Sequence, residues 1–234
     1  MFSKANRKEV VEVKQILHKF CEWTGQKINY EKSMCLFGKH VKRRNKRRIS
    51  NIMGFKQVKE FNYLGIKLAL RRLRREDFQF IIDKSMRKLN QWGNKNLSIP
   101  GKITLVKSVL LALPSYHATH SLIPKRLLEE LDRIYKNFIW NKKNGRKGLH
   151  YISWPDLCKP VEFGGRGLHS NISKTPALRA RIAWRFINNK HSLLHLIMAS
   201  KYGEKLERGY SNCCRSTAFK LLKEGLKMLK PIVR

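Results

Sequence analysis

The carboxylates of this chain are too dispersed to form a two-metal centre. Phosphoryl transfer by two metal ions requires carboxylates that converge on ions about 4 Å apart. Among the 16 acidic residues there is no Asp-Asp or Asp-x-Asp pair after an apolar segment. Glu129 and Glu130 are neighbours on an expected helix, so their side chains point about 100° apart. Glu76-Asp77 is typical of a helix N-terminus. The sequence therefore predicts no catalytic residue.

Cysteines and histidines give no better metal site. Cys213 and Cys214 are adjacent, which does not suit a zinc finger or ribbon, and no C-x-x-C is present. His191 and His195 are four residues apart, but no second pair of ligands accompanies them. We therefore expect no metal and no cofactor in this chain. The five cysteines are scattered and odd in number, which favours free thiols in a reducing, intracellular compartment.

The charge of the chain points to a polyanionic partner. Its 234 residues include 51 Lys and Arg against 16 Asp and Glu, a net charge of +35. Hydrophobic residues make up 42%, enough for a folded core, so a disordered polycation is excluded. Such a compact chain repels itself unless a polyanion screens it, and nucleic acid is the first candidate. No membrane binding is expected, because no apolar stretch reaches transmembrane length and the basic helices have no further apolar face.

Three basic runs, at 39–48, 71–75 and 142–147, are candidates for phosphate contact. The alternative is a solvated surface, or for 42–48 a nuclear-import patch, which slightly favours the nucleus. Three single lysines are added to these runs: Lys102 and Lys107 at the start of an expected helix, and Lys32. The candidate nucleic-acid-binding residues are therefore Lys32, Lys42, Arg43, Arg44, Lys46, Arg47, Arg48, Arg71, Arg72, Arg74, Arg75, Lys102, Lys107, Lys142, Lys143, Arg146 and Lys147.

Apolar spacing predicts an α+β chain that is mostly α. Helices are expected at 6–24, 49–54, 78–92, 103–113, 127–138 and 176–199, with a poorly packed or frayed one at 217–229. Short strands are expected at 27–30, 34–37 and 149–154, and a hairpin at 61–70 interrupted at Gly65. Four tryptophans fall within apolar patterns and are expected in the core: Trp92, Trp140, Trp154 and Trp184. The helices at 78–138 would bury one another as a small bundle.

The order of several motifs resembles reverse transcriptases of non-LTR (LINE-type) retrotransposons, especially those of plants. Residues 25–33, Gly-Gln-Lys-Ile-Asn-Tyr-Glu-Lys-Ser, fit a G-x-x-I-N-x-x-K-[ST] stretch, and Tyr63-Leu64-Gly65 fits the primer-grip motif after it. Residues 89–92, 97–102 and 113–116 resemble the thumb in order and spacing. Residues 154–168 fit W-x-x-L-C-x-P-x-x-x-G-G-x-G, which follows the thumb. The resemblance covers about residues 1–203.

This resemblance implies a domain order and a set of partners. Residues 1–70 would be a palm remnant with short antiparallel strands, 71–147 a helical-bundle thumb, 148–203 a helical connection segment and 204–234 a poorly ordered basic tail. The partner would be RNA, DNA or an RNA–DNA hybrid, and Tyr63, Leu64 and Gly65 would hold the primer end unless they only pack in a hairpin core. Lys32 matches a lysine near the leaving pyrophosphate, but would here be a solvated cation near phosphates.

The same resemblance implies that the chain is inactive alone. The family's catalytic aspartate pair, which binds Mg²⁺, would precede the segment that Phe2-Ser3-Lys4-Ala5 resembles. Three interpretations follow: a truncated reverse transcriptase that retains its primer–template surface, a stand-alone module that binds RNA or RNA–DNA hybrid, or a non-functional remnant of a decayed element. The absence of the aspartate pair does not separate them, whereas a stable, cooperatively folding product would favour the second.

Overall fold

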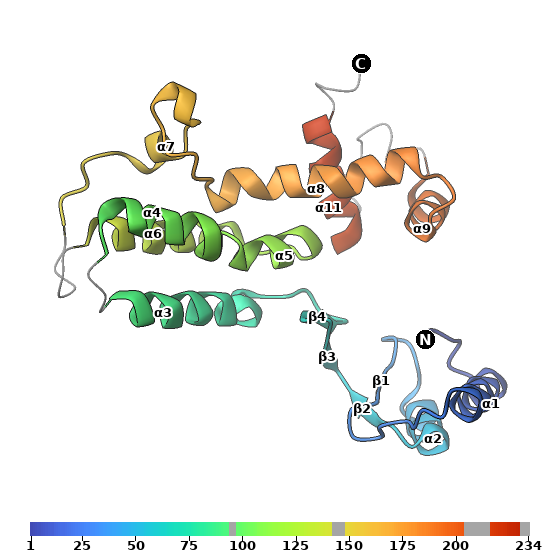
Figure 1. Cartoon of the computed structure of the whole chain (residues 1–234). Coiled ribbons are helices and arrows are strands. Elements are labelled where there is room, and N and C mark those ends of the chain that lie inside the picture. Colours follow the sequence, from blue (N-terminus) through green and yellow to red (C-terminus); the bar gives the residue numbers. More distant parts are fainter. Residues whose placement is uncertain (94–96, 142–147, 204–215, 230–234) are drawn as a thin grey trace. The chain divides into compact units, whose positions relative to one another are not determined.

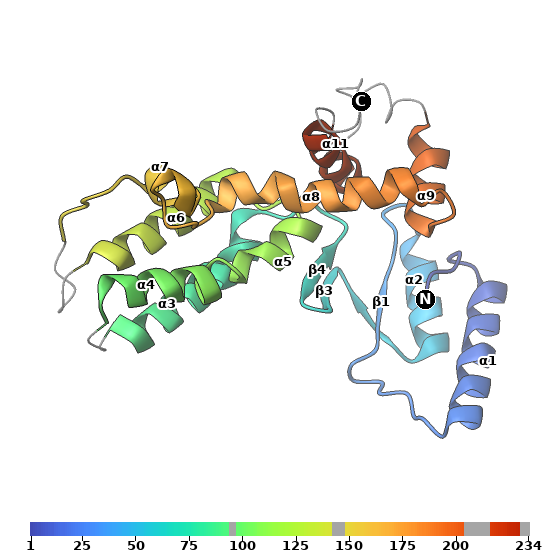
Figure 2. The ribbon, with the colours of Figure 1, turned by 45° about the horizontal axis from the view of Figure 1, so that its top comes forward.

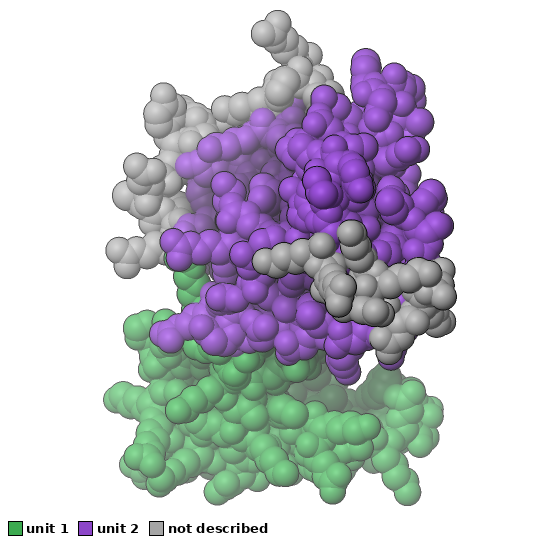
Figure 3. Space-filling view, turned by 90° about the vertical axis from the view of Figure 1, so that its left-hand side faces the viewer, with its two compact units in different colours: residues 1–72 green, residues 73–234 purple. Residues whose placement is uncertain are grey.

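The computed structural model describes residues 1–93, 97–141, 148–203 and 216–229. The chain forms two compact units, Met1–Arg72 and Leu73–Arg234 (Figure 3). It is mostly helical with a few short strands (Figure 1), so the predicted α+β, mostly α class is confirmed. Within the described ranges, no helix combines the length and the apolar character that crossing a membrane requires.

In the first unit, α1 (Arg7–Thr24) packs on α2 (Arg43–Met53). The Asn6 carboxamide accepts a hydrogen bond from the Glu9 amide at 2.9 Å and begins α1, as expected of an N-cap residue. Gly25, with a φ of 66°, ends the helix in the left-handed conformation. Val10 is buried between the two helices with Ile49 and Met53 of α2. The helix predicted at 6–24 is therefore confirmed.

The strands of this unit form two separate pairs. Strand β1 (Met34–Leu36) is parallel to β2 (Lys56–Val58), and α2 is the crossover between them. Strands β3 (Glu60–Tyr63) and β4 (Ile66–Ala69) form an antiparallel hairpin whose turn is Leu64-Gly65. Both turn residues have positive φ, 49° and 77°, as a two-residue hairpin turn demands. The predicted hairpin is confirmed, although the parallel β1–β2 pair differs from the antiparallel strands expected.

The strand expected at 27–30 is wrong. The Asn29 side chain accepts from the Lys32 amide at 3.0 Å, and its carbonyl accepts from the Ser33 hydroxyl at 2.7 Å. These local bonds close a turn, which competes with a strand for the same backbone. The turn delivers the chain into β1, so this stretch positions Lys32 just before the sheet.

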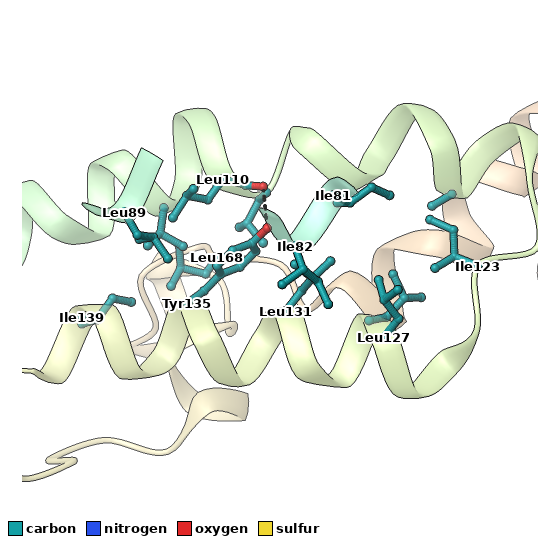
Figure 4. Close-up of a cluster of buried hydrophobic side chains, with 14 of the residues drawn as sticks. Ile81, Ile82, Leu89, Leu110, Ile123, Leu127, Leu131, Tyr135, Ile139 and Leu168 are labelled. Atoms are coloured by element: carbon teal, nitrogen blue, oxygen red, sulfur yellow. Dashed lines mark hydrogen bonds between the residues drawn. The ribbon is translucent and has the colours of Figure 1, made fainter. Parts of the chain in front are cut away.

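The second unit opens with helices that pack around one apolar core. They are η1 (Arg75–Phe78), α3 (Gln79–Gly93), α4 (Ile99–Leu105), η2 (Val106–Leu110), α5 (Leu113–His120) and α6 (Lys125–Trp140). Figure 4 shows Ile81, Leu110, Leu131 and Tyr135 among the side chains that meet in this core. Leu110, Leu131 and Tyr135 are completely buried. The expected bundle of helices is therefore present, and it rests on the predicted apolar faces.

A proline inside this bundle leaves a carbonyl that only a side chain satisfies. Pro114 has no amide proton, so the carbonyl of Leu110, four residues earlier, loses its usual helical donor. The Tyr135 hydroxyl donates to that carbonyl at 3.0 Å from α6 (Figure 4). The Ser85 hydroxyl lies 3.1 Å from the Tyr135 oxygen. Burial raises the pKa of Tyr135 to about 12, so the phenol remains a proton donor at every physiological pH.

Replacing Tyr135 with phenylalanine is expected to lower the free energy of unfolding by about 1–3 kcal/mol. The ring would still fill the core, but the Leu110 carbonyl would be buried without a donor. Urea unfolding followed by circular dichroism measures the loss. Ser85→Ala is the matched control and should cost less, because the Tyr135–Leu110 bond remains. An unchanged midpoint for Tyr135→Phe would mean that another donor reaches Leu110.

The rest of the unit comprises α7 (Trp154–Leu157), η4 (Val161–Phe163), α8 (Asn171–Asn188), α9 (Leu193–Tyr202) and α11 (Thr217–Leu229). The strand expected at 149–154 is wrong: residues 149–152 pair with no strand among the described residues, and Trp154 begins α7. The helix expected at 176–199 is present as α8 and α9. The expectation that 217–229 is poorly packed is wrong, because Phe219 and Leu222 of α11 are buried.

Three of the four tryptophans expected in the core lie in it or against it, and one does not. Trp140 is buried, and Trp92 and Trp154 are half-buried against the same core. Trp184 of α8 is 49% exposed, so its predicted place in the core is wrong. The apolar stripe of α8 is instead completed by Ala183 and Phe186, which face α11 and α9.

Helix α11 crosses α8 at a close contact (Figures 1 and 2). A methyl group on Gly225 would lie 2.4 Å from the Arg179 carbonyl oxygen and 2.8 Å from the Ala183 side chain. Arg179 is 5% exposed, and its side chain reaches the end of α5. Its Nε donates to the Ala118 carbonyl and its Nη2 to the Ser121 carbonyl, both at 3.1 Å, and Nη1 pairs with Glu224 of α11. One guanidinium thus joins three helices.

Asp132 of α6 holds the start of α8. Its carboxylate accepts from the Ser170 hydroxyl at 2.6 Å, from the Asn171 amide at 3.0 Å and from the Asn171 side chain at 2.7 Å. A carboxylate at a helix N-terminus is favourable. Burial nevertheless raises the pKa of Asp132, against the opposing effect of these hydrogen bonds.

The Asp132→Asn variant is expected to gain stability relative to the native chain as the pH rises. A raised folded pKa means that the folded state holds the proton more tightly than the unfolded state. That contribution to stability is complete below the ordinary value of about 3.9 and is lost as the pH rises through the folded pKa. Unfolding free energies measured for both proteins between acidic and neutral pH provide the test. A stability difference between the two proteins that is constant with pH, or that shifts in favour of aspartate as the pH rises, contradicts it.

Candidate nucleic-acid interface

Helix α2 carries most of the first basic run on one exposed face. Ile49 and Met53 are four residues apart, so they share the side of α2 that is buried against Val10 of α1. The opposite side is left to cations. Lys42, Arg43, Arg44, Arg47 and Arg48 are exposed and Lys46 is half-buried. The burial of the apolar face therefore fixes the basic face toward solvent.

The charge on α2 is not compensated by carboxylates in the described part of the chain. Residues 32–59 contain ten Lys and Arg and no Asp or Glu. In the described residues no carboxylate pairs with a cation of α2. The helix begins at Lys42 without a side-chain cap and has no acidic residue in its first turn. Cations there repel one another and the positive end of the helix dipole, so bound anions would stabilise this face.

Lys32 and the predicted Tyr63-Leu64-Gly65 segment lie on the same unit. Lys32 is exposed after the Asn29 turn, two residues before β1. Tyr63 and Leu64 stand at the tip of the β3–β4 hairpin and are 60% and 73% exposed. The alternative that Tyr63 only packs in a core is therefore wrong. With Gly65 completing the turn, the tip presents an aromatic and an apolar side chain to solvent.

The second basic run is partly engaged in ion pairs. Arg71 donates to Glu60 at 2.8 and 3.1 Å, and Lys67 lies 2.7 Å from the other oxygen of Glu60. The hydrogen bond from Lys67 and the pair with Arg71 lower the pKa of Glu60. Arg75 pairs with Glu130 at 2.7 Å. Arg72 and Arg74 have exposed side chains. Two arginines of this run therefore stabilise local structure, and two lie exposed on the surface.

The two predicted lysines of the bundle, Lys102 and Lys107, differ in surroundings. Lys102 donates to the Asn141 carbonyl at 2.6 Å, at the negative end of α6, and its ammonium lies 5.7 Å from the centre of the Phe138 ring. Burial lowers the pKa of Lys102. Lys107 is exposed on η2, with its ammonium beside Gly167 of the glycine-rich turn. The predicted residues Lys142, Lys143, Arg146 and Lys147 lie outside the described residues.

The structure thus gathers Lys42, Arg43, Arg44, Lys46, Arg47 and Arg48 on one helix, with Lys32 and Tyr63-Leu64-Gly65 on the same unit. Among the described residues, no three His, Cys, Asp or Glu side chains form a group that could hold a metal ion.

Two Arabidopsis thaliana proteins are similar to parts of this chain. The chain is 30% identical over 132 residues to an Arabidopsis thaliana protein provisionally named as a ribonuclease H protein, covering 56% of this chain and 21% of that protein. It is 29% identical over 93 residues to an uncharacterized mitochondrial protein of Arabidopsis thaliana, covering 39% of this chain and 60% of that one. The chain therefore spans about a fifth and about three fifths of these relatives. No family profile and no solved structure matches it.

Proposed function

We propose that this chain is a reverse-transcriptase-like protein of non-LTR retrotransposon origin that binds RNA–DNA or related duplexes and performs no polymerisation by itself. The observation that carries the binding proposal is α2, an 11-residue helix whose exposed face is basic and has no carboxylate partner among the described residues. The sequence motifs of the palm, thumb and connection support the retrotransposon origin, and so does the similarity to a plant protein provisionally named as a ribonuclease H protein.

In this proposal the first unit contacts the nucleic-acid backbone. Arginines bind phosphate oxygens through a planar fork of N–H donors, and four exposed ones lie within two turns of α2. Phosphate contacts of this kind give affinity without base specificity. The exposed Tyr63-Leu64 tip would then contact a strand end through an aromatic ring and apolar surface, as the resemblance implies. The proposal is one of binding because the sequence offers no Asp-Asp pair for a two-metal reaction.

Replacing Arg43, Arg44, Arg47 and Arg48 with glutamine is expected to weaken duplex binding and to flatten its salt dependence. Glutamine keeps helix propensity close to that of arginine, so α2 should still form. The slope of log affinity against log salt should fall by about 0.9 for each lost phosphate contact. Fluorescence anisotropy with a labelled RNA–DNA hybrid, titrated between about 50 and 200 mM salt, measures both quantities.

The matched control removes four cations elsewhere in the same unit. Arg7, Lys8, Lys19 and Lys27 are exposed, and three of them lie on α1 among Glu9, Glu12 and Glu22. Their replacement with glutamine gives the same net charge but leaves α2 intact. Equal losses in the two variants would mean that net charge alone attracts the duplex, and the α2 interface would be rejected.

A further inference from the structure

Helix α8 presents a tryptophan and two arginines on its solvent side. Trp184 is 49% exposed, and Arg181 and Arg185 are also exposed. Arg179, Ala183 and Phe186 occupy the buried side of the same helix. The exposed set therefore lies opposite the packing surface, and its exposure follows from the way α8 docks on α5, α9 and α11.

The segment that contains this surface is rich in cations and has no acidic residue. Between Glu162 and Glu204 the sequence has seven Lys and Arg and no Asp or Glu. Within this set, Arg179 makes buried contacts with α5 and α11. Neither Arg181 nor Arg185 has an ion-pair partner in the described part of the chain. No other described ring stacks on Trp184. As far as the described residues go, both the indole face and the two cations are exposed to solvent.

We propose that Trp184, Arg181 and Arg185 form a binding site for single-stranded nucleic acid, separate from the duplex-binding face of α2. A base has a π-face that stacks on an indole, and the neighbouring phosphates require cations one helical turn or less away. Arg181 is three residues before Trp184, so the two are neighbours on the helix surface, whereas Arg185 is the next residue and points about 100° away. Both residues lie within one turn of Trp184 along the helix. A protein partner of acidic character would satisfy the arginines but would not need an unpaired indole beside them.

Alanine and phenylalanine variants of Trp184 separate stacking from charge. Anisotropy is measured with two labelled single-stranded oligonucleotides of the same length, one with bases and one abasic. The native chain should bind the base-containing strand more tightly. Trp184→Ala should weaken binding of that strand by about fivefold or more and leave binding of the abasic strand unchanged. The difference in affinity between the two strands should therefore disappear. Trp184→Phe should keep part of it. Replacing Arg181 and Arg185 with glutamine should weaken both strands equally.

Controls make the outcome specific to this surface. Trp23 of α1 is 84% exposed and follows Glu22, so Trp23→Ala should bind like the native chain. Circular dichroism confirms that the α8 variants remain folded, as expected for exposed positions. Equal binding of the two strands by the native chain, or unchanged binding by Trp184→Ala, overturns the proposal. A loss of self-association in Trp184→Ala with unchanged oligonucleotide affinity assigns the surface to a protein contact instead. The α2 arginine variant, tested on a duplex, reports separately on the proposed function.

Discussion

Replacing Arg179 with methionine is expected to lower the free energy of unfolding of the Leu73–Arg234 unit by about 2–6 kcal/mol, because two buried carbonyls each lose a donor at a cost of about 1–3 kcal/mol. Methionine keeps the unbranched stem of the side chain and removes the guanidinium, so the loss comes mainly from the polar groups that the guanidinium contacts. The Ala118 carbonyl at the end of α5 would lose its donor, and the link from α5 to α11 would disappear. Hydrogen exchange of peptides from α5, α8 and α11 during urea unfolding measures the effect.

The two partners of this ion pair should respond unequally. Arg179 is 5% exposed, whereas the Glu224 side chain is 45% exposed. The charge on Arg179 is held by two helix-terminal carbonyls as well as by Glu224, and the negative end of the α5 dipole favours it. Glu224→Gln should therefore cost less than about 1 kcal/mol, as solvent-screened pairs do. If both variants lost the same amount, the carboxylate rather than the carbonyls would be the main support of the guanidinium.

A Gly225→Leu variant is expected to separate α11 from α8. Intrinsic propensity favours leucine over glycine in a helix by about 1 kcal/mol, which alone would predict stabilisation. The contact geometry opposes this: a Cβ would lie 2.4 Å from the Arg179 carbonyl oxygen, a backbone atom that cannot turn aside. Overpacking costs about 1–3 kcal/mol or more, and displacement of α11 would also expose Phe219 and Leu222. The net result is destabilisation.

Limited proteolysis and hydrogen exchange of the 217–229 peptide test this expectation. In Gly225→Leu, cleavage and exchange within α11 should increase while α3 and α6 remain protected. Lys227→Leu is the control, because it adds apolar bulk at an exposed position of the same helix and should leave α11 docked. A Gly225→Leu variant with native protection would show that α8 and α11 can move apart without cost.

Local patterns predicted most of the helices and the hairpin. The spacing of Val10, Val13 and Leu17 indicated α1, and Gly65 marked the turn of the β3–β4 hairpin, because each signal acts within a few residues. Non-local pairing was not predictable in the same way. The parallel pairing of β1 with β2 depends on how α2 returns the chain, and the packing of α11 depends on a partner helix distant in sequence.

The candidate site shows the same limit. The run at 42–48 identified the cations of α2, but the apolar residues that orient them, Ile49 and Met53, become meaningful only when α1 covers them. The engagement of Arg71 by Glu60 and of Arg75 by Glu130 could not be read from the run itself. Trp184 was misplaced because a tryptophan beside Ala183 and Phe186 resembles a core position until the side of the helix that packs is known.

The hydrogen bond between Tyr135 and the Leu110 carbonyl makes substitutions at positions 114 and 135 depend on each other. A proline at 114 requires an outside donor for that carbonyl, and a hydroxyl at 135 is required only while 114 is proline. Loss of the hydroxyl first would pass through a less stable protein, whereas loss of the proline first would free position 135 to change. Selection acting on this chain would therefore see the two sites as one unit and would permit substitutions in one order only.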